Sequence, residues 1–307
     1  MSYLPYAYFD GDYVAFSDAK VSVATHALQY GTGVFGGIRG YLSHDEKTIN
    51  IFRLPDHCER VIQSAGLVKI QLPFDTEGLA EIFVELTKRN APKGNVYYRP
   101  FAYKAGFDLT PKLTNVDDGF TLYMMALEDY YGADEGLSAM VSAWRRVNDN
   151  MIPARGKVSG AYINSSLAKD DALAYGFDEA IMLNELGKVG EGSAANLMMV
   201  RKGVLVTPPI TADILEGITR RTMFQIATDL GIEIEQRSID RTELYIADEL
   251  FFCGTGAQVT PIGSVDRRPV GDGKAGKITR AIAERFHAIV RGKVTEYEQW
   301  LTKVPVV

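Results

Sequence analysis

The sequence has few cysteines, no long apolar run and no excess of positive charge. Its two cysteines, Cys58 and Cys253, cannot form a disulfide framework or a zinc cluster. The N-terminal segment Met1–Pro5 lacks the basic and apolar parts of a signal peptide, and no apolar run approaches the roughly 20 residues of a membrane-spanning helix. With 33 Lys and Arg against 39 Asp and Glu, non-specific binding to nucleic acid or anionic lipid is disfavoured. We therefore expect a cytoplasmic protein with no metal, nucleic-acid or membrane partner.

The composition is that of a folded protein with room for more than one core. The chain has 307 residues, of which 46% are hydrophobic and 23% charged, and about 150 residues per domain is typical, so two domains are expected. The polar, glycine-containing stretch 128–136 is the predicted interdomain loop, which leaves residues 1–127 and 137–307 as the two domains. Sixteen tyrosines against 14 phenylalanines indicate polar pockets, because a buried hydroxyl needs a hydrogen-bond partner.

Hydrophobic periodicity predicts a mixed α and β fold. Asp10-Gly11 favours a tight turn within a hairpin over 8–16, and Gly231 is placed to end a helix. The predicted helices cover 25–30, a segment opening at Pro55, 76–89, 161–175, 218–230 and 274–291. The predicted strands cover 34–41, 49–53, 95–103, 119–127, 137–144, 178–184, 195–201, 203–207 and 248–253.

One glycine motif resembles a dinucleotide-binding fingerprint, which would indicate a nucleotide-dependent oxidoreductase. Residues 31–36 read Gly-Thr-Gly-Val-Phe-Gly and match G-x-G-x-x-G. That motif functions only after a strand and at the start of a helix, where the helix amides meet the pyrophosphate. Here a helical segment precedes it and a strand follows. We therefore interpret these glycines as backbone turns.

Two charged residues between glycines are candidates for chemistry. Lys157 lies between Gly156 and Gly160, and a lysine in such a place is either a solvated loop residue or a Schiff-base former activated by desolvation or by a cation such as Arg155. Glu191, between Gly190 and Gly192, is either a turn residue or a partner for a pyridinium nitrogen.

Three further features could bind a phosphate. Residues 216–220 begin a helix whose first amides form an anion site. Residues 254–257, Gly-Thr-Gly-Ala, follow a strand and could form a nest of amides. Arg60 could add a cation on the helix after residues 49–53. Each feature alone is common in proteins.

Taken in order along the chain, these features resemble the branched-chain amino-acid aminotransferases among the fold-type IV pyridoxal-phosphate enzymes. The resemblance runs from about Tyr8 to the final helix and implies a smaller N-terminal α/β sandwich domain, a larger C-terminal pseudo-barrel domain and a cofactor between them. The motifs that carry it are His26–Gly31, Val34–Arg39, Tyr97–Pro100 and Leu215–Arg220.

The resemblance implies roles for particular residues. Lys157 would bind pyridoxal 5'-phosphate and shuttle a proton, and Glu191 would pair with the pyridine nitrogen. Tyr162 would contact the phenolic oxygen. The phosphate would be held by Arg60, Ile218, Thr219 and Thr255. The substrate would meet Tyr30, Phe35, Tyr97, Arg99, Tyr130, Gly256 and Ala257, with Arg99 associated with the distal carboxylate of glutamate, although each tyrosine could equally be a core residue.

The implied reaction is transamination between branched-chain L-amino acids and 2-oxoglutarate in a homodimer or larger homo-oligomer, where Tyr30 and a loop near 107–109 would reach the partner. Two departures affect the expected substrate range. Gly36 stands where the family commonly has glutamate, and the segment 103–111 differs from the glycine-rich loop of well-known bacterial members. A D-amino-acid or (R)-amine transaminase and an aminodeoxychorismate lyase therefore remain alternatives within the same superfamily.

Overall fold

The computed structural model describes residues 2–128 and 136–306, and the chain forms two compact units. The first unit contains residues 1–128, 156–160 and 288–307, and the second contains 129–155 and 161–287. The units are therefore interleaved along the sequence, whereas two contiguous domains, 1–127 and 137–307, were expected. The C-terminal 20 residues and the segment that carries Lys157 both belong with the N-terminal part of the chain.

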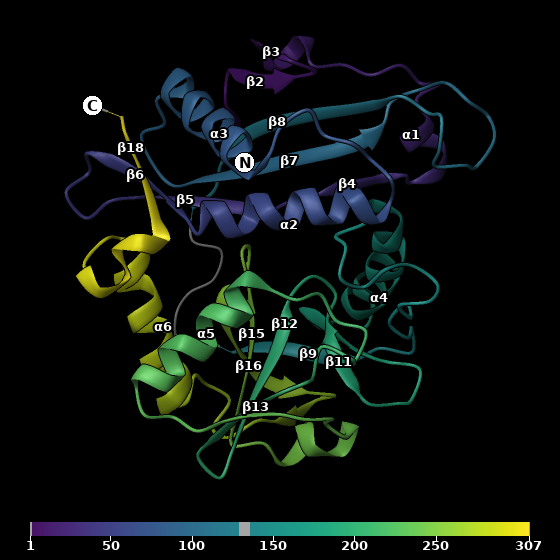
Figure 1. Ribbon diagram of the computed structural model, residues 1–307. Helices are drawn as coiled ribbons and strands as arrows, with labels where there is room; N and C mark the ends of the chain where they lie inside the picture. Colours follow the sequence, from purple (N-terminus) through teal and green to yellow (C-terminus); the bar gives the residue numbers. More distant parts are fainter. Residues whose placement is uncertain (1, 129–135, 307) are drawn as a thin grey trace. The chain divides into compact units, whose positions relative to one another are not determined.

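The first unit is built on one antiparallel sheet with the strand order β18-β6-β5-β7-β8-β2-β3, with β4 beside β7 and β1 beside β8 (Figure 1). Helix α2 packs against β4 and β7, and α3 packs against α2 and β2. The strands are β1 (Ser2–Tyr3), β2 (Tyr6–Phe9), β3 (Asp12–Ala15), β4 (Gly33–Phe35), β5 (Ile38–Leu42), β6 (Thr48–Phe52), β7 (Val96–Lys104), β8 (Asp118–Ala126) and β18 (Leu301–Pro305). The helices are η1 (Phe16–Asp18), α1 (His26–Tyr30), α2 (Leu54–Leu67), α3 (Thr76–Asn90) and η4 (Thr295–Trp300).

Local sequence explains the helices of this unit. Helix α2 has Pro55 in its first turn, where a missing N–H costs nothing, and it buries Leu54, Cys58 and Val61 on one face. Helix α3 begins after Asp75, whose carboxylate accepts a hydrogen bond from the amide of Gly78 at 2.9 Å. The two helices therefore cover the sheet with apolar faces set by a spacing of three and four residues.

The second unit contains a mixed sheet with the order β11-β10-β9-β16-β15-β12-β13-β14, and β17 pairs with β16. Strand β9 runs parallel to β10 and β16, and β13 runs parallel to β14, whereas the remaining pairs are antiparallel. The strands are β9 (Leu137–Val141), β10 (Glu179–Leu183), β11 (Val189–Gly192), β12 (Asn196–Arg201), β13 (Val204–Thr207), β14 (Ile234–Gln236), β15 (Glu249–Gly254), β16 (Gln258–Val265) and β17 (Arg268–Pro269). The helices are η2 (Ser159–Ala161), α4 (Tyr162–Ala174), α5 (Ile218–Asp229), η3 (Arg241–Ile246) and α6 (Lys277–Val290).

Most predicted elements are confirmed within a few residues, including the hairpin at Asp10-Gly11 and the helices α3 and α5. Helix α5 ends at Asp229, and Gly231 follows its C-cap residue with a φ of +70°. The single strand expected over 34–41 is wrong, because the chain breaks at Gly36-Gly37 into β4 and β5. The sequence analysis also did not predict β11, which contains Glu191, or β16.

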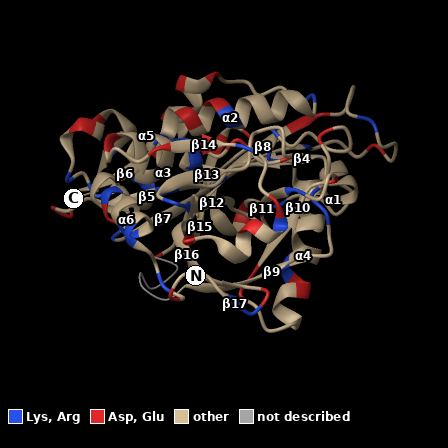
Figure 2. Cartoon of the chain, turned by 90° about the horizontal axis from the view of Figure 1, so that it is seen from below, with Lys and Arg blue, Asp and Glu red and all other residues tan. Residues whose placement is uncertain are grey.

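The charge distribution and helix lengths agree with the composition. Figure 2 shows basic and acidic residues interspersed along the chain. Within residues 2–128 and 136–306, no helix combines the length and the apolar character that crossing a bilayer requires.

Candidate active site

The segment around Lys157 is fixed to the first unit by its backbone. The amide of Phe35 donates to the carbonyl of Lys157 at 3.0 Å, and Val34 and Val158 form an antiparallel bridge. The amide of Lys157 donates to the Ser64 hydroxyl on α2 at 3.3 Å. Strand β4 and helix α2 therefore hold this lysine in a defined place, which distinguishes it from a solvated loop residue.

Glycines at 31 and 160 permit this close packing. The amide of Gly160 donates to the carbonyl of Gly31 at 3.1 Å. Gly31 has a φ of +67°, and a Cβ atom there would lie 2.8 Å from the Cα atom of Gly160. The apparent dinucleotide fingerprint thus follows helix α1 and contains strand β4, and the next element is strand β5 and not a helix, which confirms that its glycines serve backbone packing.

An aromatic and cationic cluster surrounds the lysine side chain. The Nζ atom of Lys157 lies 5.1 Å from the centroid of the Phe35 ring, and the Arg99 guanidinium lies 4.6 Å from the same centroid. Arg99 also donates to the Tyr97 hydroxyl at 3.1 Å. Its buried Nε atom has no hydrogen-bond partner among the residues described. A half-buried guanidinium whose buried Nε has no acceptor suits an anionic group, so this cluster has the chemistry for a carboxylate beside an apolar wall.

Arg60 lies on α2, four residues before Ser64 and therefore on the same face of the helix. Its Nη2 atom is 3.5 Å from Nδ1 of His57. The helix that anchors the Lys157 backbone therefore also carries the predicted phosphate-binding cation.

In the second unit, Glu191 lies within β11 and is 6% exposed. Its carboxylate accepts a hydrogen bond from Nε of Arg146 at 2.8 Å and another from Nδ2 of Asn196 at 2.9 Å. The amide of Leu215 lies 3.3 Å from the same carboxylate. A cation and two N–H donors stabilise the ionised form in this buried place, as a partner for a protonated pyridine nitrogen requires.

The predicted phosphate turn lies next to Glu191. Gly217 is the N-cap residue of α5, and the buried residues Ile218 and Thr219 occupy the first turn, where amides lack acceptors within the helix. Arg220 fixes this turn by donating to the Pro208 carbonyl at 2.7 Å and to the Gln236 side chain at 3.0 Å. Burial lowers the pKa of Arg220 below its ordinary value, although the charges of Glu216 and Glu191 oppose this.

Thr255, Gly256 and Ala257 form the turn between β15 and β16. Asn196 pairs with Cys253 in the register of β12 and β15, so the chain on either side of this pair runs side by side. A Cβ atom on Gly254 would lie 3.6 Å from Cβ of Ala195. The sheet thus brings together the Glu191 strand, the α5 turn and the Gly-Thr-Gly-Ala turn.

The remaining predicted residues are three tyrosines and Arg155. Tyr162 is half-buried at the start of α4. The Tyr30 hydroxyl on α1 donates to the carbonyl of Leu109. Tyr130 lies outside the described residues. Arg155, considered as the cation near Lys157, is exposed and pairs with Asp149 at 3.4 Å and with Glu216 at 3.1 Å.

Two contributors were missed by the sequence analysis. Arg146 lies 45 residues before Glu191 in a loop with no motif, so no local signal indicates their contact. Asn196 lies in the quoted segment after Glu191, but only the register of β12 shows that its side chain reaches that carboxylate. Both residues come from the second unit. Arg60 in the first unit and the first amides of α5 in the second unit suit a phosphate group. The Glu191 carboxylate in the second unit suits a basic ring nitrogen.

Comparison with known proteins agrees with this chemistry. Residues 33–265 match the family model described as "Amino-transferase class IV". A protein from Synechocystis sp. named "Probable branched-chain-amino-acid aminotransferase" is 43% identical over 99% of this chain and 98% of its own. The branched-chain aminotransferase of Thermoproteus uzoniensis, solved with norvaline, is 42% identical with a TM-score of 0.94, covering 99% of this chain and 100% of that one. The branched-chain amino acid aminotransferase of Thermobaculum terrenum, solved in its PLP-form, is 36% identical with a TM-score of 0.94, covering 99% of each chain.

Proposed function

Because the chain belongs to the class IV aminotransferase family, we propose that it transfers the amino group of leucine, isoleucine and valine to 2-oxoglutarate, giving branched-chain 2-oxo acids and glutamate. Relatives and solved structures that cover nearly the whole chain carry branched-chain aminotransferase names, and they confirm the expected fold-type IV class. The observation that carries the proposal is the cluster of Lys157, Phe35 and Arg99, in which one apolar ring contacts both the lysine amine and the Arg99 guanidinium.

The cofactor is pyridoxal 5'-phosphate, whose ring, when bound, stabilises the negative charge left on a substrate Cα that has lost its proton. In the proposed site Lys157 would hold the cofactor through its Nζ atom and would move the proton at the substrate Cα. The carboxylate of Glu191 would accept a hydrogen bond from the protonated pyridine nitrogen, and the hydroxyl of Tyr162 would donate to the phenolic oxygen. The phosphate is held by the side chains of Arg60 and Thr255 and by the amides of Ile218 and Thr219.

The substrate is bound by a second group of residues. Phe35 and Tyr97 form the proposed aliphatic wall, with Tyr30 at its rim, and Tyr130, which lies outside the described residues, is proposed as a further substrate contact. Arg99 meets the distal carboxylate of glutamate, and the amides of Gly256 and Ala257 meet the α-carboxylate. This wall would contact the aliphatic side chain of a branched-chain substrate in one half-reaction. In the other half-reaction Arg99 would pair with the distal carboxylate of glutamate.

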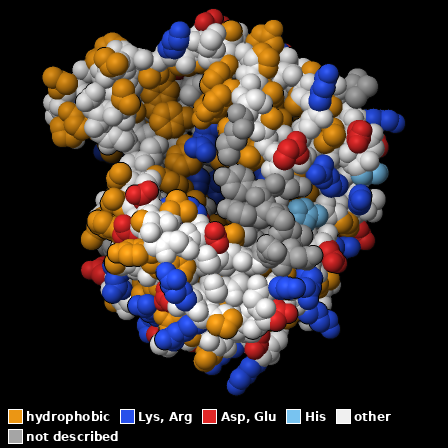
Figure 3. Space-filling model, turned by 180° about the vertical axis from the view of Figure 1, so that it is seen from behind, with side chains coloured by type: hydrophobic (Ala, Val, Ile, Leu, Met, Phe, Trp, Pro, Cys, Tyr) orange, Lys and Arg blue, Asp and Glu red, His pale blue; other side chains and the backbone are white. Residues whose placement is uncertain are grey.

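A homodimer in the cytoplasm is part of the proposal. The loop after β7 exposes Phe107 by 66% and Leu109 by 80%, and it is hydrogen-bonded to Tyr30 of α1, a helix that also exposes Leu28. Figure 3 shows hydrophobic side chains gathered over this end of the first unit, and such an exposed apolar patch favours contact with another protein surface. The buried free thiols of Cys58 and Cys253 support a reducing compartment.

The first test is spectroscopic. We expect the protein purified with pyridoxal phosphate to show the yellow band of a lysine-bound cofactor, and we expect borohydride to attach the cofactor irreversibly to Lys157. Lys157→Ala should lose the band and the adduct and reduce turnover by about a thousandfold or more, while the far-UV circular dichroism stays unchanged. Full turnover by this variant would refute the assignment of Lys157.

Substrate range is the second test, because Gly36 replaces the glutamate common in the family. Gly36 is buried, and a Cβ atom there would lie 2.6 Å from Cγ of Pro100 and 3.2 Å from Cγ2 of Val61, so these neighbouring side chains leave no room for a carboxylate side chain. We expect kcat/KM for leucine, isoleucine and valine to exceed that for D-alanine and (R)-1-phenylethylamine. A preference for D-alanine or the (R)-amine would instead indicate the alternative transaminases of the superfamily.

A further inference from the structure

The carboxylate of Glu191 is held by a network that extends to the phosphate turn. Asn196 uses both hydrogens of its amide, since Nδ2 donates to Glu191 at 2.9 Å and to the Leu215 carbonyl at 3.0 Å. Its side chain is 5% exposed, so neither bond competes with water. One buried amide therefore links the residue proposed for the ring nitrogen to the chain that enters α5.

The other end of the Asn196 side chain lies against the N-cap of α5. A Cβ atom on Gly217 would lie 2.0 Å from Oδ1 of Asn196, although the φ of Gly217 is −67° and needs no glycine. The glycine is therefore required by the approach of the amide and not by the backbone angle. Asn196 and Gly217 form a fitted pair immediately before the amides of Ile218 and Thr219.

Arg146 fixes the opposite side of the carboxylate. Its side chain is 11% exposed and forms an ion pair with Glu191 at 2.8 Å, while its own amide donates to the Leu183 carbonyl at 2.8 Å. Removal of one member of a buried ion pair leaves an uncompensated charge, so this arginine holds the carboxylate both ionised and oriented. Arg146 lies in the chain that follows β9, whereas Asn196 lies on β12 and also contacts the Leu215 carbonyl in the chain that enters α5.

We propose that Asn196 and Arg146 are positioning residues that affect different parts of the cofactor site. Asn196 couples the ring end of the cofactor site to its phosphate end, whereas Arg146 acts on the ring end alone. The inference rests on the proposed roles of Glu191 and of the Ile218 and Thr219 amides. Substitution of Asn196 should therefore weaken binding at both the ring end and the phosphate end of the site. Substitution of Arg146 should weaken binding at the ring end only.

The test measures binding to the apoprotein of two halves of the cofactor, pyridoxal and inorganic phosphate, as well as pyridoxal phosphate itself. We expect Asn196→Ala to weaken pyridoxal and phosphate each by about tenfold or more, as the loss of a hydrogen bond to a charged group does. Arg146→Lys should weaken pyridoxal by a similar factor and leave phosphate affinity within about twofold. Asn50→Ala is the matched control, because Asn50 is also a buried asparagine and its amide donates to the Val290 carbonyl, both residues belonging to the first unit.

Gly217→Ala, made alone and in the Asn196→Ala background, distinguishes loss of the coupling from a general loss of folding. Gly217→Ala should weaken phosphate binding when Asn196 is present, because the new methyl group meets Oδ1, but should add nothing in the Asn196→Ala background. Additive losses, or an Asn196→Ala variant with normal phosphate affinity, would overturn the coupling. If the unmodified protein binds pyridoxal phosphate without a lysine adduct, the proposed function fails instead, and the two failures are distinguishable.

Discussion

At the scale of single residues, Gly31 is a sensitive position because it supports the Lys157 segment. A Cβ atom there would meet Gly160 at 2.8 Å, and the φ of +67° disfavours any other residue. We expect Gly31→Ala to cost about 1–3 kcal/mol in unfolding free energy and to move the lysine, so the absorption band of the bound cofactor should shift or weaken.

Gly11→Ala is the matched control for this prediction. Gly11 has a φ of +107°, but no atom lies within 4 Å of the position that a Cβ atom would take, so its substitution adds strain without displacing a neighbour. It should lower the thermal midpoint and leave the cofactor band unchanged. Equal spectral effects from the two variants would contradict the proposed support of the Lys157 segment by Gly31.

Residue-level prediction from the sequence succeeded where glycines mark a charged residue and failed where the contact is distant. Lys157 and Glu191 could be selected because Gly156 and Gly190 precede them. Their surroundings could not, since the contact of Arg146 with Glu191 depends on how two separate strands are paired in the sheet. The roles of the selected residues remain predictions.

At the scale of elements, His26 fastens the loop after β7 to α1. Its buried ring lies 2.7 Å from the Thr32 hydroxyl and 3.0 Å from the Thr110 carbonyl, and its amide donates to the Gly106 carbonyl at 2.9 Å. His26→Leu removes both ring contacts, so we expect proteolysis within 106–112 to become several times faster. In the same preparation, cleavage elsewhere should be unchanged.

A matched substitution separates this anchor from general loosening. His44 contacts the Arg291 carbonyl at 3.2 Å on an exposed surface, so His44→Leu should leave the loop as resistant as before. If both variants open the loop equally, the ring of His26 is not its anchor. If the first variant cuts the rate of transamination without opening the loop, His26 acts on Tyr30, whose ring centroid lies 4.7 Å from its own.

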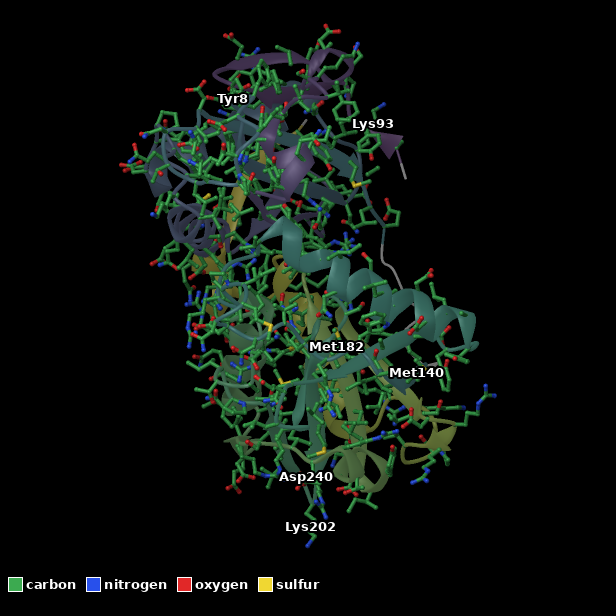
Figure 4. All side chains as sticks on the ribbon, turned by 90° about the vertical axis from the view of Figure 1, so that its right-hand side faces the viewer. Tyr8, Lys93, Met140, Met182, Lys202 and Asp240 are labelled. Atoms are coloured by element: carbon green, nitrogen blue, oxygen red, sulfur yellow. The ribbon has the colours of Figure 1, made fainter. Side chains whose placement is uncertain are left out.

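Glu243 gives the second unit a stability that depends on pH. It completes a capping box with Asp240, which is labelled in Figure 4, and it pairs with Arg237 at 2.8 Å and Arg201 at 2.6 Å. The hydrogen bond from Arg237 is the main cause that lowers the pKa of Glu243 to about 2 from 4.5. This contribution is present above pH 4.5 and is lost as the pH falls towards 2.

We therefore expect Glu243→Gln to cost about 1–3 kcal/mol at pH 7, with a penalty that shrinks steadily between about pH 4.5 and pH 3. Thermal midpoints measured across this range provide the check. Glu298→Gln, at an exposed pair with Lys303, serves as the control and should change little at any pH. A penalty for Glu243→Gln that is the same at neutral pH and at the acid end of the range would show that the charge is not its source.

Helices and strands were predicted well where a regular spacing of apolar residues continues over several turns. They were predicted poorly where glycine interrupts an apolar run. Helix α3 has Leu79, Phe83 and Leu86 on one buried face and a capping Asp75, so its position could be predicted from the sequence. The run over 34–41 has the composition of one strand, but the buried pair Gly36-Gly37 packs against Pro100 and Tyr97 and divides it. This packing depends on β7, which lies about 60 residues later in the sequence.

At the scale of the whole molecule, the chain returns at its end to the sheet with which it began. Strand β18 pairs with β6 over Leu301–Pro305, and β1 pairs with β8 of the same sheet. The amide of Arg53 donates to the Trp300 carbonyl at 2.6 Å, and its guanidinium lies 4.4 Å from the Trp300 ring. A contiguous C-terminal domain could not be distinguished from this arrangement by sequence, because strand pairing between such distant parts of the chain leaves no local pattern.

Loss of the C-terminal residues should therefore damage the first unit and spare the second. A chain ending at Val294 lacks η4 and β18 and would uncover the buried residues Ile49 and Ile51 on β6. We expect amide hydrogen exchange to accelerate over β5 and β6 and to stay slow over β12 and β15. Lys303→Pro, which removes one N–H from the β18 ladder opposite Asn50 without shortening the chain, should have the same effect to a smaller degree. Faster exchange confined to the second unit would instead place the tail with the domain that the sequence predicted.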